Sequence, residues 1–156
     1  MTRALAKGQS GGEAKTTRNI NPLKSRSPMT DKAKRGLTEK LIELASDGNV
    51  FEARKLIAEG ADVNGEGFEW PPIVMAAVNR HTEMLLLLGM KGADLEGTDA
   101  LEGRSAMHWA ALNGFYECVV SLDNLGSKKD AKDNRGKTPR DLAIENKHYQ
   151  VAEFLE

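Results

Sequence analysis

Few residues in this 156-residue chain stand at spacings that could do chemistry, and each candidate also fits a turn. Gly136-Lys137-Thr138 resembles the end of a phosphate-binding loop, but the leading glycine of such a loop would fall at Ala131. The acidic run 130–134 resembles a calcium loop only in part, because Lys132 occupies a ligand position. We therefore interpret both segments as turns.

The histidines and the single cysteine do not form a metal or nucleophile pattern. His81, His108 and His148 lie far apart in the sequence, with no cysteine or second histidine at metal-ligand spacing. No triad is suggested by spacing, although one can assemble from distant residues. Cys118, being alone, excludes an internal disulfide and is compatible with a reducing compartment. The sequence predicts a non-catalytic protein that needs no cofactor or metal.

A motif that returns about every 33 residues indicates how these side chains are positioned. Gly60-Ala61-Asp62-Val63-Asn64 is followed by Gly92-Ala93-Asp94-Leu95-Glu96 and by an eroded copy, Gly126-Ser127-Lys128-Lys129-Asp130. A second landmark recurs in phase with it: Pro72 before Ala76-Ala77, Ala106 before Ala110-Ala111, and Pro139 before Ala143-Ile144. Such self-similarity predicts a stack of supersecondary units, none of which can bury its apolar face alone.

Each unit is predicted to pair two helices, which glycines and polar residues separate. The expected pairs are 37–45 with 51–59, 73–78 with 82–91, 106–112 with 115–125, and 139–144 with 149–155. The connecting segments 64–70, 96–104 and 130–137 are polar and contain glycine, so they suit β-hairpin turns.

This pattern resembles the ankyrin repeat. Asp133–Pro139 matches the family's loop and turn, Ser105–Gly114 matches its inner helix, and 37–64 resembles an N-terminal capping repeat. The resemblance implies an all-α solenoid of helix-turn-helix units with short β-hairpin loops over residues 37–156, in approximate units 37–66, 67–99, 100–132 and 133–156. It also implies that His108 hydrogen-bonds between neighbouring turns and that Cys118 and Trp109 are buried.

Two residues depart from the family pattern. Arg80 and Lys147 stand where the family has glycine after the inner helix. A non-glycine residue in a left-handed conformation costs about 1 kcal/mol, so these two turns are expected to be strained or reshaped.

The first 36 residues are predicted to form a basic, disordered N-terminal arm. They hold nine Lys/Arg against Glu13 and Asp31, a net charge of +7, whereas residues 37–156 hold 13 against 21, a net charge of −8. Their hydrophobic residues follow no helical or strand period. The arm's candidate contact residues are Arg3, Lys7, Lys15, Arg18, Lys24 and Arg26, and Ser27 is a candidate phosphorylation site.

The arm has two interpretations: a tether for an acidic surface or a large assembly, or a solvated tail. Nucleic acid is disfavoured as a partner, except within a ribonucleoprotein, because the arm has no aromatic residue to stack on bases. No apolar run is long enough to span a bilayer.

The family resemblance implies a protein-binding surface made of hairpin tips and the exposed ends of inner helices. The tip positions are Phe68, Trp70, Leu101, Glu102, Arg104, Asn134, Arg135 and Lys137. The inner-helix positions are Ser46, Asp47, Val78, Asn79, Leu112, Asn113, Glu145 and Asn146. Phe68 and Trp70 stand out, because two large aromatic side chains in a loop either bind a partner or fold back on the protein.

Three roles follow from this surface. The first is an adaptor or scaffold subunit that binds one or more partner proteins. The second is a structural component of a ribosome, organelle complex or axoneme, docked by the arm. The third is a protein inhibitor of an enzyme. The expected location is intracellular, in the cytoplasm or nucleus, with an organelle or axoneme left open.

Overall fold

The computed structural model describes residues 29–156, and Asp31–Glu156 form one compact unit. The arm residues Arg3 to Ser27 lie outside the described residues. The helices of the described part are α3 (Asp31–Asp47), α4 (Val50–Glu59), α5 (Pro72–Val78), α6 (Thr82–Met90), α7 (Ala106–Leu112), α8 (Tyr116–Leu125), α9 (Pro139–Glu145) and α10 (Tyr149–Phe154). None of them is both long and apolar enough to cross a membrane.

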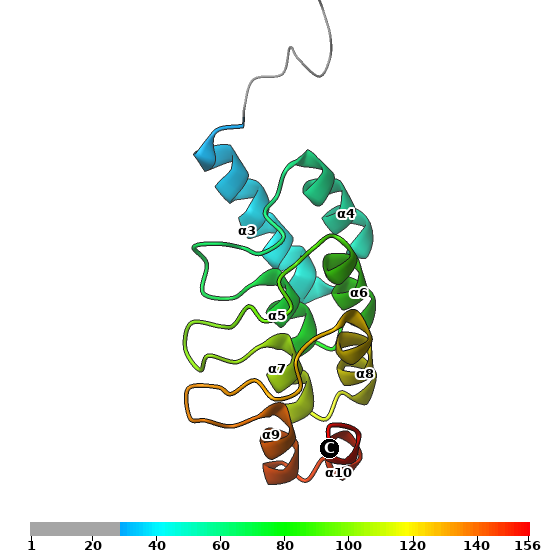
Figure 1. The fold of residues 1–156 in the computed structure, drawn as a ribbon. Helices are drawn as coiled ribbons and strands as arrows, with labels where there is room; N and C mark the ends of the chain where they lie inside the picture. Colours follow the sequence, from blue (N-terminus) through cyan, green and yellow to red (C-terminus); the bar gives the residue numbers. More distant parts are fainter. Residues whose placement is uncertain (1–28) are drawn as a thin grey trace, which may run out of the picture. The chain divides into compact units, whose positions relative to one another are not determined.

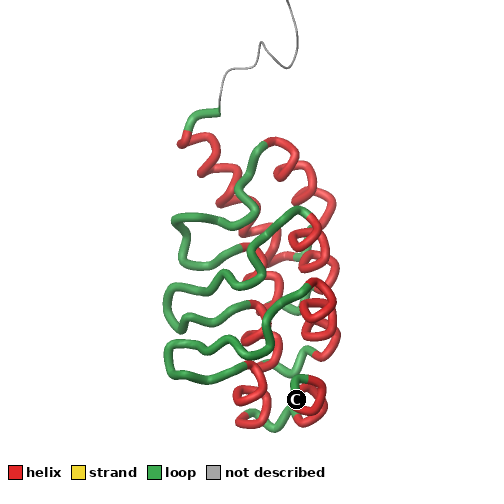
Figure 2. The backbone as a smooth tube through the Cα atoms, viewed as in Figure 1, coloured by secondary structure: helices red, strands yellow, loops and turns green. Residues whose placement is uncertain are grey.

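These helices form two stacked rows. The inner row is α3, α5, α7 and α9, the outer row is α4, α6, α8 and α10, and each helix packs on its neighbour in the row (Figure 1). Three loops project from the inner row to one side (Figure 2), and we call residues 61–71, 93–105 and 127–138 the first, second and third finger. This arrangement confirms the predicted ankyrin-repeat solenoid.

The fingers are hairpin-shaped but nearly free of β-structure. The one antiparallel bridge assigned within residues 29–156 joins Thr98 to Ser105, in the second finger. In the third finger the amide of Asp133 donates to the carbonyl of Lys137 at 2.9 Å. The loops are therefore held mainly by hydrogen bonds to side chains.

The first helix begins at Asp31, before the predicted start at Leu37. Residues 31–36 are exposed, so they show no apolar period from which a helix could be inferred. The helix is continuous across this boundary, because the Thr38 hydroxyl donates to the carbonyl of Lys34 at 2.8 Å. Residues 31–36, which were expected in the arm, are thus in one continuous helix with residues 37–47.

The ends of the helices follow from the residues that cap them. Ser105 and His108 form a capping box at the start of α7, and Thr138 and Asp141 form another at the start of α9. Arg80 and Lys147 both have a φ of 62°, so the left-handed turns predicted for these non-glycine residues are present.

The core lies between the two rows of helices. Small side chains of the inner row, the alanine pairs 76–77 and 110–111, are completely buried and let the neighbouring units approach closely. Leu41, Met84, Leu85, Leu88 and Leu122 are among the largest fully buried side chains. The array is therefore stabilised by contacts between units, as is typical of a solenoid.

Candidate functional site

An aspartate organises each of the three fingers. In the first finger the Asp62 carboxylate accepts hydrogen bonds from the amides of Asn64 and Glu66, at 2.9 and 3.0 Å. In the other two fingers Asp99 and Asp133, which are almost entirely buried, have a similar role, although the residue that aligns with Asp62 in the repeat is Asp94. These side chains replace the strand pairing that the short loops lack.

Asp99 is the most fully satisfied of the three. One carboxylate oxygen accepts from the amides of Leu101 and Glu102, at 2.9 and 2.6 Å. The other accepts from the amide of Arg104 at 3.1 Å and from the indole Nε1 of Trp109 at 2.9 Å. Burial by itself raises the pKa of Asp99, but these donated hydrogen bonds hold the pKa below its ordinary value. The carboxylate is therefore ionised and fixes the second finger on α7.

Asp133 joins the second and third fingers. Its carboxylate accepts from the amides of Arg135 and Lys137, both at 2.9 Å, and from Nε of Arg104 at 3.0 Å. Burial raises the pKa of Asp133, and the bonds from Lys137, Arg104 and Arg135 together lower it overall. The Arg104 guanidinium also lies 5.2 Å from the ring of Trp109.

Arg104 consequently differs from the exposed tip residue that the sequence suggested. Its side chain is only 11% exposed and is paired with the buried carboxylate of Asp133. Sequence spacing did not reveal this pair, because the two residues belong to different repeats. We assign Arg104 to holding the fingers together.

Backbone hydrogen bonds also tie each finger to the next. The amide of Ala100 donates to the carbonyl of Glu69 at 2.9 Å, and the amide of Asn134 donates to the carbonyl of Glu102 at 3.0 Å. The Asn134 side chain adds a bond to the carbonyl of Leu101 at 3.2 Å. The three tips therefore form one continuous surface.

The two aromatic residues of the first finger pack on the protein. The Phe68 ring lies 4.4 Å from the guanidinium of Arg35 in α3. The Trp70 ring lies 5.6 Å from the ring of Trp109 in the neighbouring unit. Both residues are half-buried, so part of each stays accessible at the surface.

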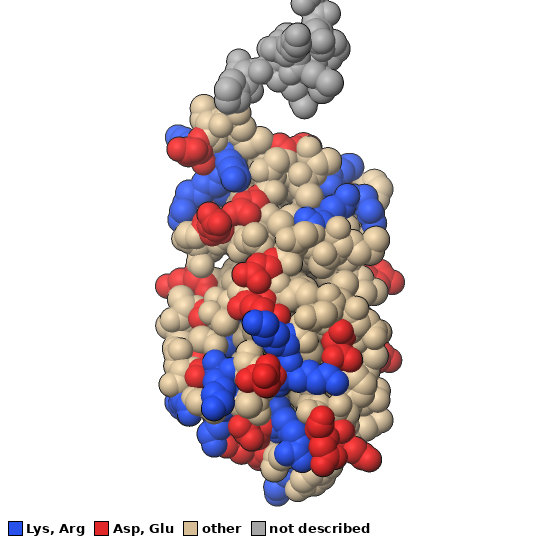
Figure 3. All heavy atoms as spheres, in the orientation of Figure 1, with Lys and Arg blue, Asp and Glu red and all other residues tan. Residues whose placement is uncertain are grey.

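Of the tip residues predicted from the sequence, the exposed ones lie in the second and third fingers. Leu101 is 67% exposed, and the side chain of Arg135 is 71% exposed beside Glu102. Lys137 pairs with Glu145 of α9, and the hydrogen bond from this carboxylate raises the pKa of Lys137. Basic and acidic side chains are interspersed over this face of the molecule (Figure 3). The tip surface thus offers an apolar contact within a mixed-charge rim.

The inner-helix positions divide into caps and apolar contacts. The side-chain amides of Asn79, Asn113 and Asn146 each donate to the carbonyl four residues earlier, at 2.9, 2.9 and 2.8 Å, so these residues end their helices. Val78 and Leu112 are half-buried. A hollow of about 370 Å³ lies between α3 and α5, and its lining is Ile42, Glu43, Ser46, Asp47 and Met75.

His108 is a structural residue. Its ring nitrogen Nδ1 accepts from the amide of Ser105 at 3.2 Å, while Nε2 lies 2.9 Å from the carbonyl of Lys137. Burial lowers the pKa of His108 more than its hydrogen bond to Lys137 raises it, so the ring is neutral and donates through Nε2. This is the bond between neighbouring turns that the family resemblance implied.

Cys118 has the character of an inert core thiol. It is completely buried, 3.4 Å from the hydroxyl of Thr82, and burial raises the pKa of the thiol. Within the part of the chain that the structure describes, no three His, Cys, Asp or Glu side chains are grouped so that they could hold a metal.

Two residues of the site were not anticipated from the sequence. Asp99 carried a signal that could have revealed it, since it stands in the same place in its unit as Asp133 does in the next. Trp109 was expected in the core between repeats, but it is half-buried and directs its indole nitrogen to Asp99. Asp99 binds the backbone of the second finger, and Trp109 of α7 holds Asp99 in place.

Comparison with known proteins agrees with this architecture. The family model described as "Ankyrin repeats (3 copies)" matches residues 86–156. Human "Cyclin-dependent kinase 4 inhibitor B" is 35% identical over 123 residues, which cover 77% of this chain and 87% of that protein. Human "Cyclin-dependent kinase inhibitor 2A" is 34% identical over 118 residues, 74% of each chain.

A third relative shows the same region within a much larger protein. Hydra vulgaris "Tyrosine-protein kinase HTK16" is 32% identical over 126 residues, which cover 78% of this chain but 16% of that protein. The repeating motif, the stacked helix pairs with projecting fingers and the match to the two human relatives over most of their length together show that the chain belongs to the ankyrin-repeat family.

Proposed function

We propose that this chain is a non-catalytic protein-binding module that binds a partner through its finger tips and the exposed ends of its inner helices. The observation that carries the proposal is the rigid presentation of the tips. Asp99 and Asp133 hold the second and third fingers from within, while Leu101 and Arg135 stay exposed at the surface. A preorganised loop loses little conformational entropy on binding, which favours affinity.

Among the three roles predicted from the sequence, inhibition of an enzyme has the most specific support. Two relatives that match this chain over most of their own length are cyclin-dependent kinase inhibitors by name. We propose a protein kinase of this class as the partner, which the finger surface covers as a stoichiometric inhibitor. An adaptor role would use the same surface without loss of the partner's activity.

The remaining predictions from the sequence concern the basic arm and the location of the protein, and not the finger surface. Docking of the basic arm on a large assembly concerns residues 1–36, most of which lie outside the described residues. It stays a prediction, as do the boundaries of the arm and an intracellular location.

The proposal is tested by titrating the full chain into active cyclin-dependent kinase 4 with its cyclin and measuring phosphorylation of a protein substrate. We expect activity to fall with an equimolar end point. Leu101→Glu, which places a charge in the centre of the tip surface, should weaken inhibition by at least about tenfold. Tyr149→Glu is the matched control, because it makes the same change at an exposed large hydrophobic residue of the outer row, away from the fingers.

The possible outcomes distinguish the inhibitor role from the adaptor role and test the finger surface as the binding site. Binding without inhibition would favour the adaptor role, and equal loss of inhibition by both variants would refute the finger surface as the site. Absence of binding to the kinase would reject this partner class.

A further inference from the structure

The outer surface of α6 is apolar where a solenoid helix normally meets water. Its inward side chains, Met84, Leu85 and Leu88, are completely buried. On the outward side, Leu86 is 38% exposed and Met90 is 80% exposed. Glu83 is the only charged residue within Thr82–Met90, and a helix that is apolar over nearly all of its surface is normally buried or contacts a partner.

The neighbouring outer helices do not carry both of these residues. When the glycines that follow the outer helices are aligned, the position of Leu86 holds Arg54 in α4 and Val120 in α8, and the position of Met90 holds Ala58 in α4 and Asn124 in α8. Of these three helices, α6 therefore is the one with two large apolar side chains at these outward positions. The packing between units does not account for them.

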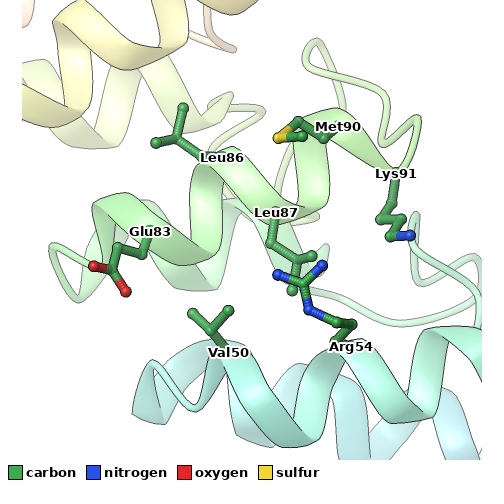
Figure 4. Close-up of a pocket in the computed structure, with 7 residues that line it drawn as sticks. All are labelled: Val50, Arg54, Glu83, Leu86, Leu87, Met90 and Lys91. Carbon is green, nitrogen blue, oxygen red and sulfur yellow. The ribbon is translucent and has the colours of Figure 1, made fainter.

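These residues border a groove of about 340 Å³ between α4 and α6. Its apolar part consists of Val50 from α4 and Leu86, Leu87 and Met90 from α6. Figure 4 shows the α6 side chains along one rim and Val50 below them. The groove is open and lies on the side of the solenoid away from the fingers.

The two ends of the groove carry opposite charges. Glu83 lies at one end of α6 and Lys91 at the other, and Arg54 lies on the Lys91 side of Leu87 (Figure 4). At 3.6 residues per turn, positions 83, 86, 87, 90 and 91 fall within a sector about 140° wide. Leu87 stands midway between the two charged residues, which are about 12 Å apart along the helix.

We propose that a second copy of this chain occupies the groove, with the two α6 helices antiparallel across a two-fold axis near Leu87. In this arrangement Glu83 of each copy lies opposite Lys91 and Arg54 of the other, and Leu86 and Met90 of both copies are buried together. A two-fold contact must be complementary to itself, and an acid at one end with cations at the other satisfies that condition. We expect this interface to bury less than about 1,200 Å² of surface, which is the size class of weak complexes, so the dimer is weak.

The test measures the mass of the full chain by sedimentation equilibrium up to a concentration on the order of 1 mM. The wild-type chain should show a concentration-dependent dimer. Glu83→Lys opposes Lys to Lys at both ends of the contact, and Lys91→Glu opposes Glu to Glu. Each variant alone should therefore raise the dissociation constant by at least about tenfold.

An equimolar mixture of the two variants distinguishes this geometry from any other contact. Within a mixed dimer both ends again pair a lysine with a glutamate, so the mixture should recover dimer that neither variant forms alone. Glu117→Lys is the matched control, because Glu117 occupies the same position in the first turn of α8 outside the groove, and it should dimerise like the wild type. A wild-type chain that stays monomeric, or a mixture that stays monomeric, would overturn the proposal.

Discussion

Substitution of Asp99 by asparagine should loosen the second finger more than any change at the surface. The carboxylate accepts four hydrogen bonds, two on each oxygen. Asparagine keeps one acceptor oxygen and presents an NH₂ group to the remaining two donors. A hydrogen bond to a charged group contributes about 1.5–3 kcal/mol, so the loss of two predicts about 3 kcal/mol at the low end of that range.

The pKa of Asp99 adds a pH dependence with a definite sign. Because the folded-state pKa is lowered, the carboxylate stabilises the fold above the unfolded value of about 3.9, and that contribution is lost as the pH falls towards the folded value. The asparagine variant has no such group. The difference in unfolding free energy between the wild type and Asp99→Asn should therefore be constant above about pH 5 and shrink below it.

Urea denaturation at several pH values measures both effects. Asp130→Asn, which removes an exposed carboxylate of the third finger, is the control and should change the free energy of unfolding by less than about 0.5 kcal/mol. A loss at Asp99 no larger than at Asp130, or a difference that persists unchanged at pH 3, would refute the role assigned to this carboxylate.

Three further predictions concern the turns and the core thiol. Gly114→Ala should lower the free energy of unfolding by at least about 2 kcal/mol, because φ at Gly114 is +72° and a Cβ there would lie 2.4 Å from Nδ1 of His148. This loss should be larger than that of Gly136→Ala, because φ at Gly136 is +76° but the space around it is open. Lys147→Gly should raise the free energy of unfolding by about 0.5 kcal/mol, since it relieves a left-handed residue but adds entropy to the unfolded chain. Cys118 should react with iodoacetamide at least about 100-fold more slowly in the folded chain than in urea, and fast labelling of folded protein would contradict its burial.

The helix pairs were predictable because their signals are local. Gly60 and Gly126 end their helices in the left-handed conformation, and the alanine pairs of the inner helices mark where units meet. The start of α3 at Asp31 was not predictable in the same way. A charged, exposed turn of helix carries no apolar period, so only its continuity with the packed part of α3 shows it.

The roles of individual finger residues depend on contacts across repeats, which spacing alone does not give. Arg104 was expected at a binding tip, and the structure pairs it with Asp133 of the next finger. Phe68 was expected to bind or to pack locally, and its contact is Arg35, in a segment that the sequence assigned to the arm. Leu101 and Arg135, by contrast, are exposed where the family pattern predicted.

The central claim is that the finger surface binds a protein partner, and affinity capture from native extract with quantitative mass spectrometry tests it directly. The baits are the full chain, the double variant Leu101→Glu/Arg135→Glu, Tyr149→Glu on the outer row, and a chain shortened to begin at Met29 so that α3 stays intact. The account predicts that a partner captured in stoichiometric amount is lost with the double finger variant and kept by the other two. Retention of every stoichiometric partner by the double finger variant, with loss on shortening the chain, would contradict it and make the arm the binding element.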